Sequence, residues 1–257
     1  MNTDDCDVGA STGKETPTLD GEDTSWLHRD DAPWIIGHRG AAGLAPENTL
    51  ESFARAESLA TAAVEFDIQV AHGDLWILHD ATLDRTTTLR GALTDQTPNT
   101  LAAAGVPTLN STVAALQPTT RLNVELKGSA TGAALARWEA DRSDVIGRLL
   151  ISSFRWEELA DYRDAGGTSA VGVLSPRLRD RVLRTAEQLC AWSINLKELW
   201  LSRSAVSRVR AAGYACLVYT VNDVQRAQQL QQWGVQGVFT DRPDWVTRAA
   251  LTAHPTR

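Results

Sequence analysis

The sequence predicts an α/β fold of the TIM type, a (β/α)8 barrel with a short hairpin or loop insertion after the second strand. From residue 34 onward, short apolar runs alternate with longer helical segments, which is the pattern of repeated βα units. Once one hairpin partner is set aside, about eight runs remain as parallel strands, the number that closes such a barrel. The length of 257 residues is usual for one barrel domain.

The first 30 residues differ from the rest of the chain in composition. They are rich in Asp, Glu, Ser, Thr and Gly and have almost nothing to bury. Residues 1–30 are therefore predicted to form a disordered acidic tail, with at most a short contact at Trp26 or Leu27. Residues 31–257 are predicted to form the barrel.

Nine short apolar runs are predicted to be strands. The run at Leu75 follows the turn-forming group Ala71-His72-Gly73-Asp74, so it is expected to be the hairpin partner of the strand before it. In chain order, the predicted strands are Trp34–Gly37, Ala63–Val70, Leu75–His79, Arg121–Leu126, Leu149–Ser152, Ala170–Leu174, Ala191–Leu196, Ala215–Thr220 and Gly237–Phe239.

Helical segments lie between most of these strands. The first follows Asn48-Thr49-Leu50-Glu51, which has the pattern of a helix cap with its matching Glu. The last follows Thr240-Asp241-Arg242-Pro243, where proline stands near the first helical turn. The predicted helices are Thr49–Ala60, Ala130–Asp141, Trp156–Ala165, Pro176–Gln188, Ser204–Ala212, Asp223–Trp233 and Pro243–Ala253.

Composition and charge argue against several classes of function. The formal net charge of −7 disfavours a nucleic-acid-binding surface and offers no basic stripe for anionic membranes. No apolar stretch is long enough to cross a bilayer, and the amino terminus lacks the features of a secretory signal. We therefore expect neither nucleic acid nor integral membrane association, and the oligomeric state stays open.

The cysteines favour a reducing compartment. Cys6, Cys190 and Cys216 are odd in number, far apart and without metal-ligand spacing. Neither a disulfide framework nor a zinc site is expected, and reduced, buried thiols are predicted. Together with the absence of a signal, this predicts a cytoplasmic protein.

Two predicted strands alternate between apolar and polar side chains. Because strand side chains alternate by two, Glu65 and Asp67 share one face of the second strand, and Glu125 and Lys127 share one face of a later strand. Three such carboxylates against one lysine need further positive charge. One divalent cation, Mg²⁺ or Ca²⁺ with Mn²⁺ as a further option, suits this all-oxygen set. The alternative is a metal-free ion-pair network closed by Lys127 and Arg39.

Two histidines are expected at strand ends, where barrel enzymes place catalytic side chains. His38 and His79 titrate near neutral pH, so one is able to accept a proton while the other donates one. A structural, hydrogen-bonded histidine is the alternative for each. Arg39 carries a planar fork that matches phosphate oxygens, or it pairs with Glu65 or Asp80.

Asn48 and Tyr219 each have a structural and a site interpretation. Asn48 is predicted mainly to cap the first helix, with contact to the site or substrate as its second role. Tyr219, at the start of Tyr219-Thr220-Val221-Asn222, is predicted to floor the pocket. Alternatively, that segment simply starts a helix at Asn222 or Asp223.

Together these motifs resemble the glycerophosphodiester phosphodiesterase family. The resemblance runs in order from about residue 34 to 245, and its first half is the more specific. It rests on His38-Arg39-Gly40, Pro46-Glu47-Asn48-Thr49, Glu65-Phe66-Asp67, His79-Asp80, Leu83-Asp84-Arg85-Thr86-Thr87, Pro107-Thr108-Leu109, Asn123-Val124-Glu125-Leu126-Lys127, Tyr219-Thr220-Val221-Asn222 and Gly237-Val238-Phe239-Thr240-Asp241-Arg242-Pro243.

The resemblance implies a TIM-type barrel that hydrolyses small-molecule glycerophosphodiesters to glycerol 3-phosphate and an alcohol. It implies His38 and His79 as general acid and base, without saying which is which. Its remaining implications are one divalent cation held by Glu65, Asp67 and Glu125, and phosphate oxygens held by Arg39 and Lys127.

Two departures from the family pattern concern the substrate. The stretch from Asp80 to Pro107 is shorter than the usual insertion, and Tyr219 stands where the family generally has Trp. A related barrel phosphodiesterase acting on lysophospholipids and a catalytically silent barrel that binds a phosphorylated metabolite are therefore the competing hypotheses. An amidohydrolase is disfavoured because it would need His, not Gly, at position 40.

Overall fold

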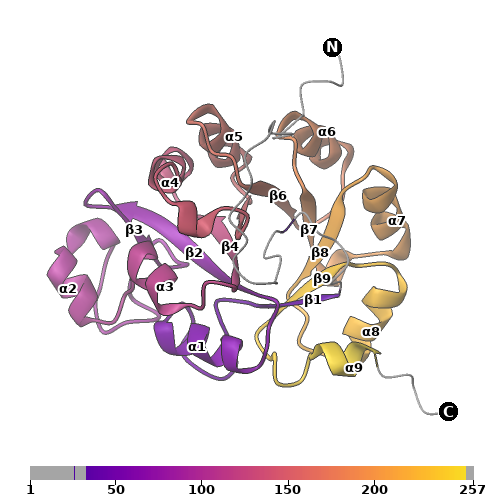
Figure 1. Cartoon of the computed structure of the whole chain (residues 1–257), viewed down its shortest axis with the longest axis horizontal. Coiled ribbons are helices and arrows are strands. Elements are labelled where there is room, and N and C mark those ends of the chain that lie inside the picture. The colour runs from indigo at the N-terminus through magenta and orange to yellow at the C-terminus, as the bar shows by residue number, and fades with distance from the viewer. Residues whose placement is uncertain (1–25, 27–32, 253–257) are drawn as a thin grey trace.

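The computed structural model describes Trp26 and residues 33–252, and it confirms the predicted barrel. Eight parallel strands form a closed ring, since β1 pairs with both β2 and β9. Helices surround the ring on its outside (Figure 1). The strands are β1 (Trp34–Gly37), β2 (Ala63–Ala71), β3 (Asp74–Ile77), β4 (Arg121–Leu126), β5 (Leu149–Ser153), β6 (Ala170–Ser175), β7 (Ser193–Lys197), β8 (Ala215–Tyr219) and β9 (Gly237–Thr240).

The predicted hairpin is also present. β3 runs antiparallel to β2 through the turn at His72 and Gly73, both of which have positive φ. It extends the sheet beyond the ring, beside α2 (Figure 1). The helices are α1 (Leu50–Ser58), α2 (Pro98–Ala103), α3 (Leu109–Ala115), α4 (Thr131–Glu139), α5 (Trp156–Asp164), α6 (Asp180–Gln188), α7 (Arg203–Ala211), α8 (Val224–Gln232) and α9 (Arg248–Thr252).

Two of these helices were not predicted, and two predictions placed the start of a helix too early. The predicted helix Pro176–Gln188 is α6, which begins at Asp180. The short helices α2 and α3 begin at threonine caps, where Thr97 and Thr108 accept from the amides of Thr100 and Ser111. The predicted helix Pro243–Ala253 is instead a turn followed by α9.

An ion pair explains the late start of α9. The Arg242 guanidinium donates to the Asp244 carboxylate at 2.8 and 2.9 Å, and the Thr240 hydroxyl accepts from the Arg242 amide at 3.1 Å. These side-chain bonds favour a local turn over a regular first helical turn.

Three tryptophans fill the amino-terminal end of the barrel. The rings of Trp26 and Trp34 meet edge to face with centroids 5.8 Å apart, and Trp192 lies 5.7 Å from Trp26. Trp26 is 1% exposed, and its indole nitrogen donates to the Arg148 carbonyl at 2.7 Å. The expected contact at Trp26 is therefore present, whereas the rest of residues 1–30 and Leu27 lie outside the described residues.

The expectation of reduced thiols is wrong for one cysteine. Cys190 is disulfide-bonded, whereas Cys216 is a buried free thiol, and Cys6 lies outside the described residues. Among the described residues, every helix is too short or too polar to cross a bilayer.

Candidate active site

Three carboxylates meet at the carboxyl-terminal end of the barrel. Glu65 and Asp67 lie on β2, and Glu125 on β4 stands directly beside Asp67 in the parallel register. Each offers an oxygen to a group whose atoms lie within 4.8 Å of one another, and all three residues are buried. The alternation of β2 and β4 thus brings the predicted acidic set together.

The charges of this acidic triad are only partly balanced. Burial first, and then the neighbouring Asp67, raise the pKa of Glu65 to about 8 and of Glu125 to about 7. Burial would also raise the pKa of Asp67, but Lys127 and Arg39 outweigh it and the pKa is lowered. The buried Oε1 of Glu65 makes no hydrogen bond. The set has only oxygen ligands, one of them without a partner, and it carries excess negative charge. These features fit a divalent cation such as Mg²⁺ or Ca²⁺.

Two cations border the triad. The Lys127 ammonium donates to Glu125 and lies 3.2 Å from Asp67 Oδ1. The backbone N–H of Arg39 donates to Glu65 Oε2 at 2.7 Å, and its guanidinium Nε lies 3.5 Å from Asp67 Oδ2. Both contacts of the metal-free interpretation therefore exist, although Arg39 shares its charge with a fourth carboxylate.

That fourth carboxylate is Glu47. Arg39 Nη1 donates to Glu47 Oε1 at 2.8 Å, and Arg85 donates to both Glu47 oxygens at 2.7 and 2.8 Å. Burial opposes the charged form of Glu47, but Arg85 and Arg39 lower its pKa below the ordinary value. With Glu47 paired in this way, the triad keeps a net negative charge.

His38 sits where β1 ends and is held by Asp241, which comes directly after β9, the last strand of the ring. Its Nδ1 lies 2.6 Å from Asp241 Oδ1, and Asn222 donates to the other Asp241 oxygen at 2.7 Å. Burial lowers the pKa of His38, but the Asp241 hydrogen bond and the charge of Glu65 outweigh it, so the pKa is raised. Because Nδ1 is occupied, Nε2 is the nitrogen free for proton transfer.

His79 has the same kind of partner from its own loop. Its Nδ1 lies 2.6 Å from Asp80 Oδ1, and Arg85 Nε donates to Asp80 Oδ2 at 2.5 Å. The hydrogen bonds of Arg85 and His79 lower the pKa of Asp80. Arg85 therefore joins the His79 loop to Glu47.

Asn48 does not cap the first helix. Thr49 is the N-cap of α1, and its hydroxyl accepts from the Ser52 amide at 3.2 Å. Asn48 has a φ of 58° and uses both amide atoms on Asp67, donating at 2.8 Å and accepting from the Asp67 amide at 3.3 Å. Asparagine tolerates this left-handed conformation, so its polar atoms turn toward the triad. The capping interpretation was wrong.

Tyr219 and Phe154 form an aromatic wall beside the triad. Their ring centroids are 5.6 Å apart at 89°, and the Lys127 ammonium lies 5.8 Å from the Phe154 ring. The Tyr219 hydroxyl is buried without a hydrogen bond, and burial raises its pKa. Asn222 precedes α8, whose N-cap is Asp223, as the alternative interpretation of this segment expected.

Two residues of this arrangement were not predicted: Asp241, the partner of His38, and Asn222, which donates to Asp241. Both were interpreted as residues that start helices. A signal was present, since Asp241 comes directly after the last strand, and Gly37 pairs with Thr240 when the ring closes. Closure alone places residue 241 beside residue 38.

Comparison with known proteins shows the family of this chain. Residues 38–245 match the model of the glycerophosphoryl diester phosphodiesterase family. The glycerophosphodiester phosphodiesterase of Bacillus altitudinis is 27% identical over 233 residues, covering 82% of this chain and 95% of the relative. That of Bacillus subtilis is 27% identical over 253 residues, covering 81% and 83%.

A solved structure shares the fold. The phosphodiesterase of Oleispira antarctica, solved in complex with the product sn-glycerol-3-phosphate, superposes with a TM-score of 0.78. It is 26% identical, and the match covers 87% of this chain and 98% of that protein. With a family model spanning the barrel and its acidic mouth, the chain belongs to the glycerophosphoryl diester phosphodiesterase family and is a phosphodiester hydrolase.

Proposed function

We propose that the protein hydrolyses glycerophosphodiesters to glycerol 3-phosphate and an alcohol by metal-assisted acid–base catalysis with two histidines. One observation carries this proposal. At a single barrel mouth, the triad Glu65, Asp67 and Glu125 stands with two histidines, each of which has its Nδ1 bound to an aspartate. The glycerol 3-phosphate bound to the Oleispira antarctica relative supports the choice of substrate.

The triad and its cations would bind the phosphate. Glu65, Asp67 and Glu125 would hold one divalent cation, which when bound neutralises charge on the phosphoryl oxygens. Lys127 and Arg39 already border the triad, so they are placed to donate to the same oxygens as the phosphorus–oxygen bond breaks. Asn48 keeps Asp67 oriented through both of its amide atoms.

The two histidines would move the protons. One Nε2 takes the proton of the nucleophile, either water or the neighbouring glycerol hydroxyl, and the other gives a proton to the leaving alcohol oxygen. If the hydroxyl attacks, the product is a cyclic phosphate, which water then opens to glycerol 3-phosphate. Asp241 fixes the ring of His38 and Asp80 fixes that of His79, so each imidazole keeps its orientation through the cycle. Tyr219 and Phe154 would face the part of the substrate beyond the phosphate.

Substitution of each histidine tests the mechanism. His38→Ala and His79→Ala should each lower kcat on glycerophosphocholine by roughly 10²–10⁴-fold. His72→Ala is the matched control, because His72 lies in the turn between β2 and β3, where its ring contacts the Leu93 carbonyl at 3.3 Å. Near-normal turnover by both variants would overturn the two-histidine mechanism.

Metal dependence is tested separately. Activity should vanish in chelator and return with Mg²⁺, Ca²⁺ or Mn²⁺, assayed in turn to find the preferred ion. Full activity in chelator would contradict the role of the triad, even if the histidine variants behaved as expected.

A lysophospholipid substrate is the second candidate. It is favoured by the aromatic wall, where Phe154 is 43% exposed at the mouth. Choline release from lysophosphatidylcholine and from glycerophosphocholine, compared under the same conditions, decides between the two substrates.

A further inference from the structure

One sector of the barrel carries the opposite charge from the rest of the chain. Residues 175–212, from the end of β6 to the end of α7, contain eight Lys and Arg but only three Asp and Glu, whereas the whole chain has a formal charge of −7. The eight basic side chains are exposed: Arg177, Arg179, Arg181, Arg184, Lys197, Arg203, Arg208 and Arg210. The sector is therefore locally cationic on an acidic protein, so the expectation from net charge that the chain has no basic stripe does not hold for this sector.

Five of these cations lie toward the carboxyl-terminal end of the barrel, the end that holds the triad. They come from the loop after β6, the first residues of α6, the end of β7 and the start of α7. We call Arg177, Arg179, Arg181, Lys197 and Arg203 the basic rim. Two acidic side chains, Asp180 and Glu198, lie in the same segments, and each forms an ion pair with an arginine outside the rim.

Those two acids leave the basic rim uncompensated. Asp180 accepts from Arg208 at 2.8 Å, outside the rim. Glu198 accepts from Arg226 Nε of α8 at 2.5 Å. Neither acid pairs with a member of the basic rim, so within residues 33–252 these two carboxylates do not balance the charge of the rim.

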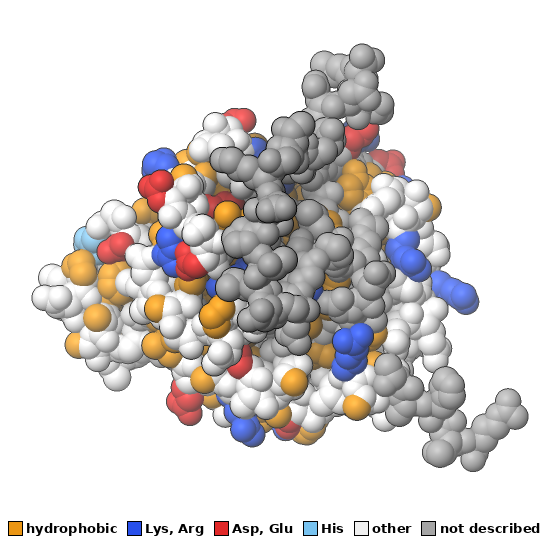
Figure 2. Space-filling view, in the orientation of Figure 1, with side chains coloured by type: hydrophobic (Ala, Val, Ile, Leu, Met, Phe, Trp, Pro, Cys, Tyr) orange, Lys and Arg blue, Asp and Glu red, His pale blue; other side chains and the backbone are white. Residues whose placement is uncertain are grey.

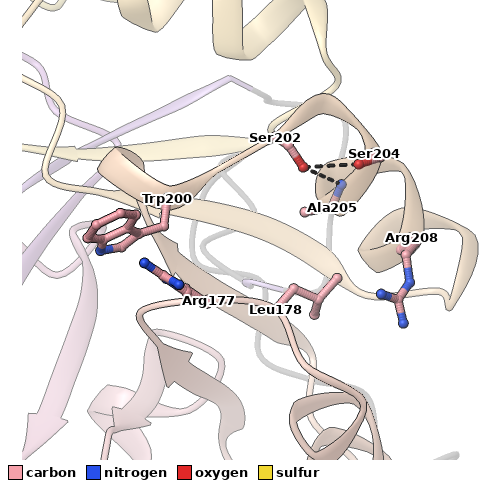
Figure 3. Close-up of a pocket in the computed structure, with 7 residues that line it drawn as sticks. All are labelled: Arg177, Leu178, Trp200, Ser202, Ser204, Ala205 and Arg208. Atoms are coloured by element: carbon pink, nitrogen blue, oxygen red, sulfur yellow. Dashed lines mark hydrogen bonds between the residues drawn. The ribbon is translucent and has the colours of Figure 1, made fainter.

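Large apolar side chains project beside the rim. Leu199 is 65% exposed and Trp200 is 50% exposed, in the short 3-10 turn Glu198–Trp200 that follows β7. The Arg177 guanidinium lies 3.9 Å from the centre of the Trp200 ring. Figure 3 shows these two side chains stacked across the gap between their loops, with Leu178 between them and α7. A hollow of about 400 Å³ opens there, lined in part by Ser202 and Arg208.

We propose that the basic rim, with Leu199 and Trp200, is a docking surface for an anionic phospholipid bilayer. Exposed arginines attract anionic head groups, each contributing on the order of a tenfold gain in partitioning or less. Tryptophan settles at the head-group level because it joins a large apolar ring to one polar N–H. An exposed leucine beside it adds apolar area to bury.

The pairing of charge with apolar side chains favours lipid over nucleic acid. A nucleic-acid surface uses cations to contact phosphates and aromatic rings to stack on bases. An exposed leucine would add nothing to such a surface. A bilayer uses both components. Trp245, 52% exposed after β9 with Arg242 at 3.5 Å from its ring, lies at the same end of the barrel. Docking through the basic rim would thus turn the barrel mouth toward the membrane.

Vesicle co-sedimentation of the full chain tests this docking. Vesicles of phosphatidylcholine alone and of phosphatidylcholine with phosphatidylglycerol are compared in chelator, so that no turnover occurs. The protein should partition at least about tenfold more onto the anionic vesicles, and high salt should remove most of the difference.

Two paired substitutions separate charge from apolar contact. Arg177→Glu with Arg179→Glu should lower partitioning about tenfold or more, and Leu199→Ser with Trp200→Ser should lower it several-fold. The matched controls are Arg55→Glu, on the last turn of α1, and Ile146→Ser, which is 70% exposed just before β5. Both controls lie toward the amino-terminal end of the barrel and should bind as wild type.

The outcomes are distinct. Equal partitioning on neutral and anionic vesicles, no binding by wild type, or equal losses in the controls and the rim variants would each overturn the proposal. So would tight binding to RNA that the Leu199 and Trp200 substitutions leave unchanged. The rim variants should keep wild-type activity on water-soluble glycerophosphocholine, so failure of the proposed function is measured separately from failure of docking.

Discussion

The metal-free protein should lose stability as pH rises, and replacing Glu65 of the triad should reduce this loss. Burial and the charge of Asp67 raise the pKa of Glu65 from 4.5 to about 8. A group whose pKa is higher in the folded than in the unfolded state stabilises the fold fully below its unfolded pKa. That stability is lost as pH rises through the folded pKa, here between about pH 4.5 and 8. The raised pKa of His38 acts in the same direction.

The magnitude follows from the shift. At pH 7.5, about three units above the ordinary pKa of Glu65, the raised folded-state pKa has cost the fold ~4 kcal/mol in unfolding free energy. For a barrel of this size such a loss lowers Tm by roughly 10 °C. In Glu65→Gln the amide cannot ionise, and its N–H groups would face Asp67 and Glu125. In chelator at pH 8 the variant should therefore be more stable than wild type.

Thermal unfolding is followed by circular dichroism in chelator from pH 5 to pH 8, and it measures this change in stability. The Tm difference between Glu65→Gln and wild type should be small at pH 5 and grow with pH. Added Mg²⁺ or Ca²⁺ should stabilise wild type and not the variant. Glu187→Gln, an exposed glutamate on α6, is the control and should show neither trend. A Tm difference that does not change with pH would refute the reasoning.

Three further predictions concern other parts of the chain. Asp241→Asn should lower kcat/KM about a hundredfold and shift the limb of the pH profile that belongs to His38 to lower pH, because Asp241 holds the pKa of His38 up; an unshifted limb would contradict this. Trp26→Ala should cost about 3–5 kcal/mol in unfolding free energy by emptying the amino-terminal end of the barrel, with turnover at room temperature kept. Cys216 should resist thiol reagents until the protein unfolds, since burial raises its pKa to about 12; rapid labelling of the native protein would refute this.

Local periodicity was enough to predict the acidic triad. Glu65 and Asp67 are two residues apart on one strand, so their common face follows from strand geometry alone. Glu125 joined them because a second strand had the same alternation and lies next to β2 in the ring. The ring itself was predictable because each βα unit shows its own apolar run.

Contacts were not predictable where two local conformations of the backbone and side chains compete. Asn48 and Thr49 are both good caps, and only the left-handed backbone at Asn48 decides that Thr49 caps and Asn48 binds Asp67. Likewise, α9 starts late because Arg242 bonds to Asp244 rather than to solvent. In each case two side-chain arrangements of similar energy compete, and the surrounding packing selects one.

The two histidines depend on the fold in different ways. His79 obtains its aspartate from the next residue, so that pair needs only its own loop. His38 obtains Asp241 from 203 residues away, and the two meet only because β1 pairs with β9. The β1–β9 pairing, the seam that closes the ring, therefore also sets the orientation of the His38 imidazole, one of the two groups proposed for proton transfer. A substitution that loosens this seam should disable His38 before it unfolds the barrel, whereas His79 would stay paired.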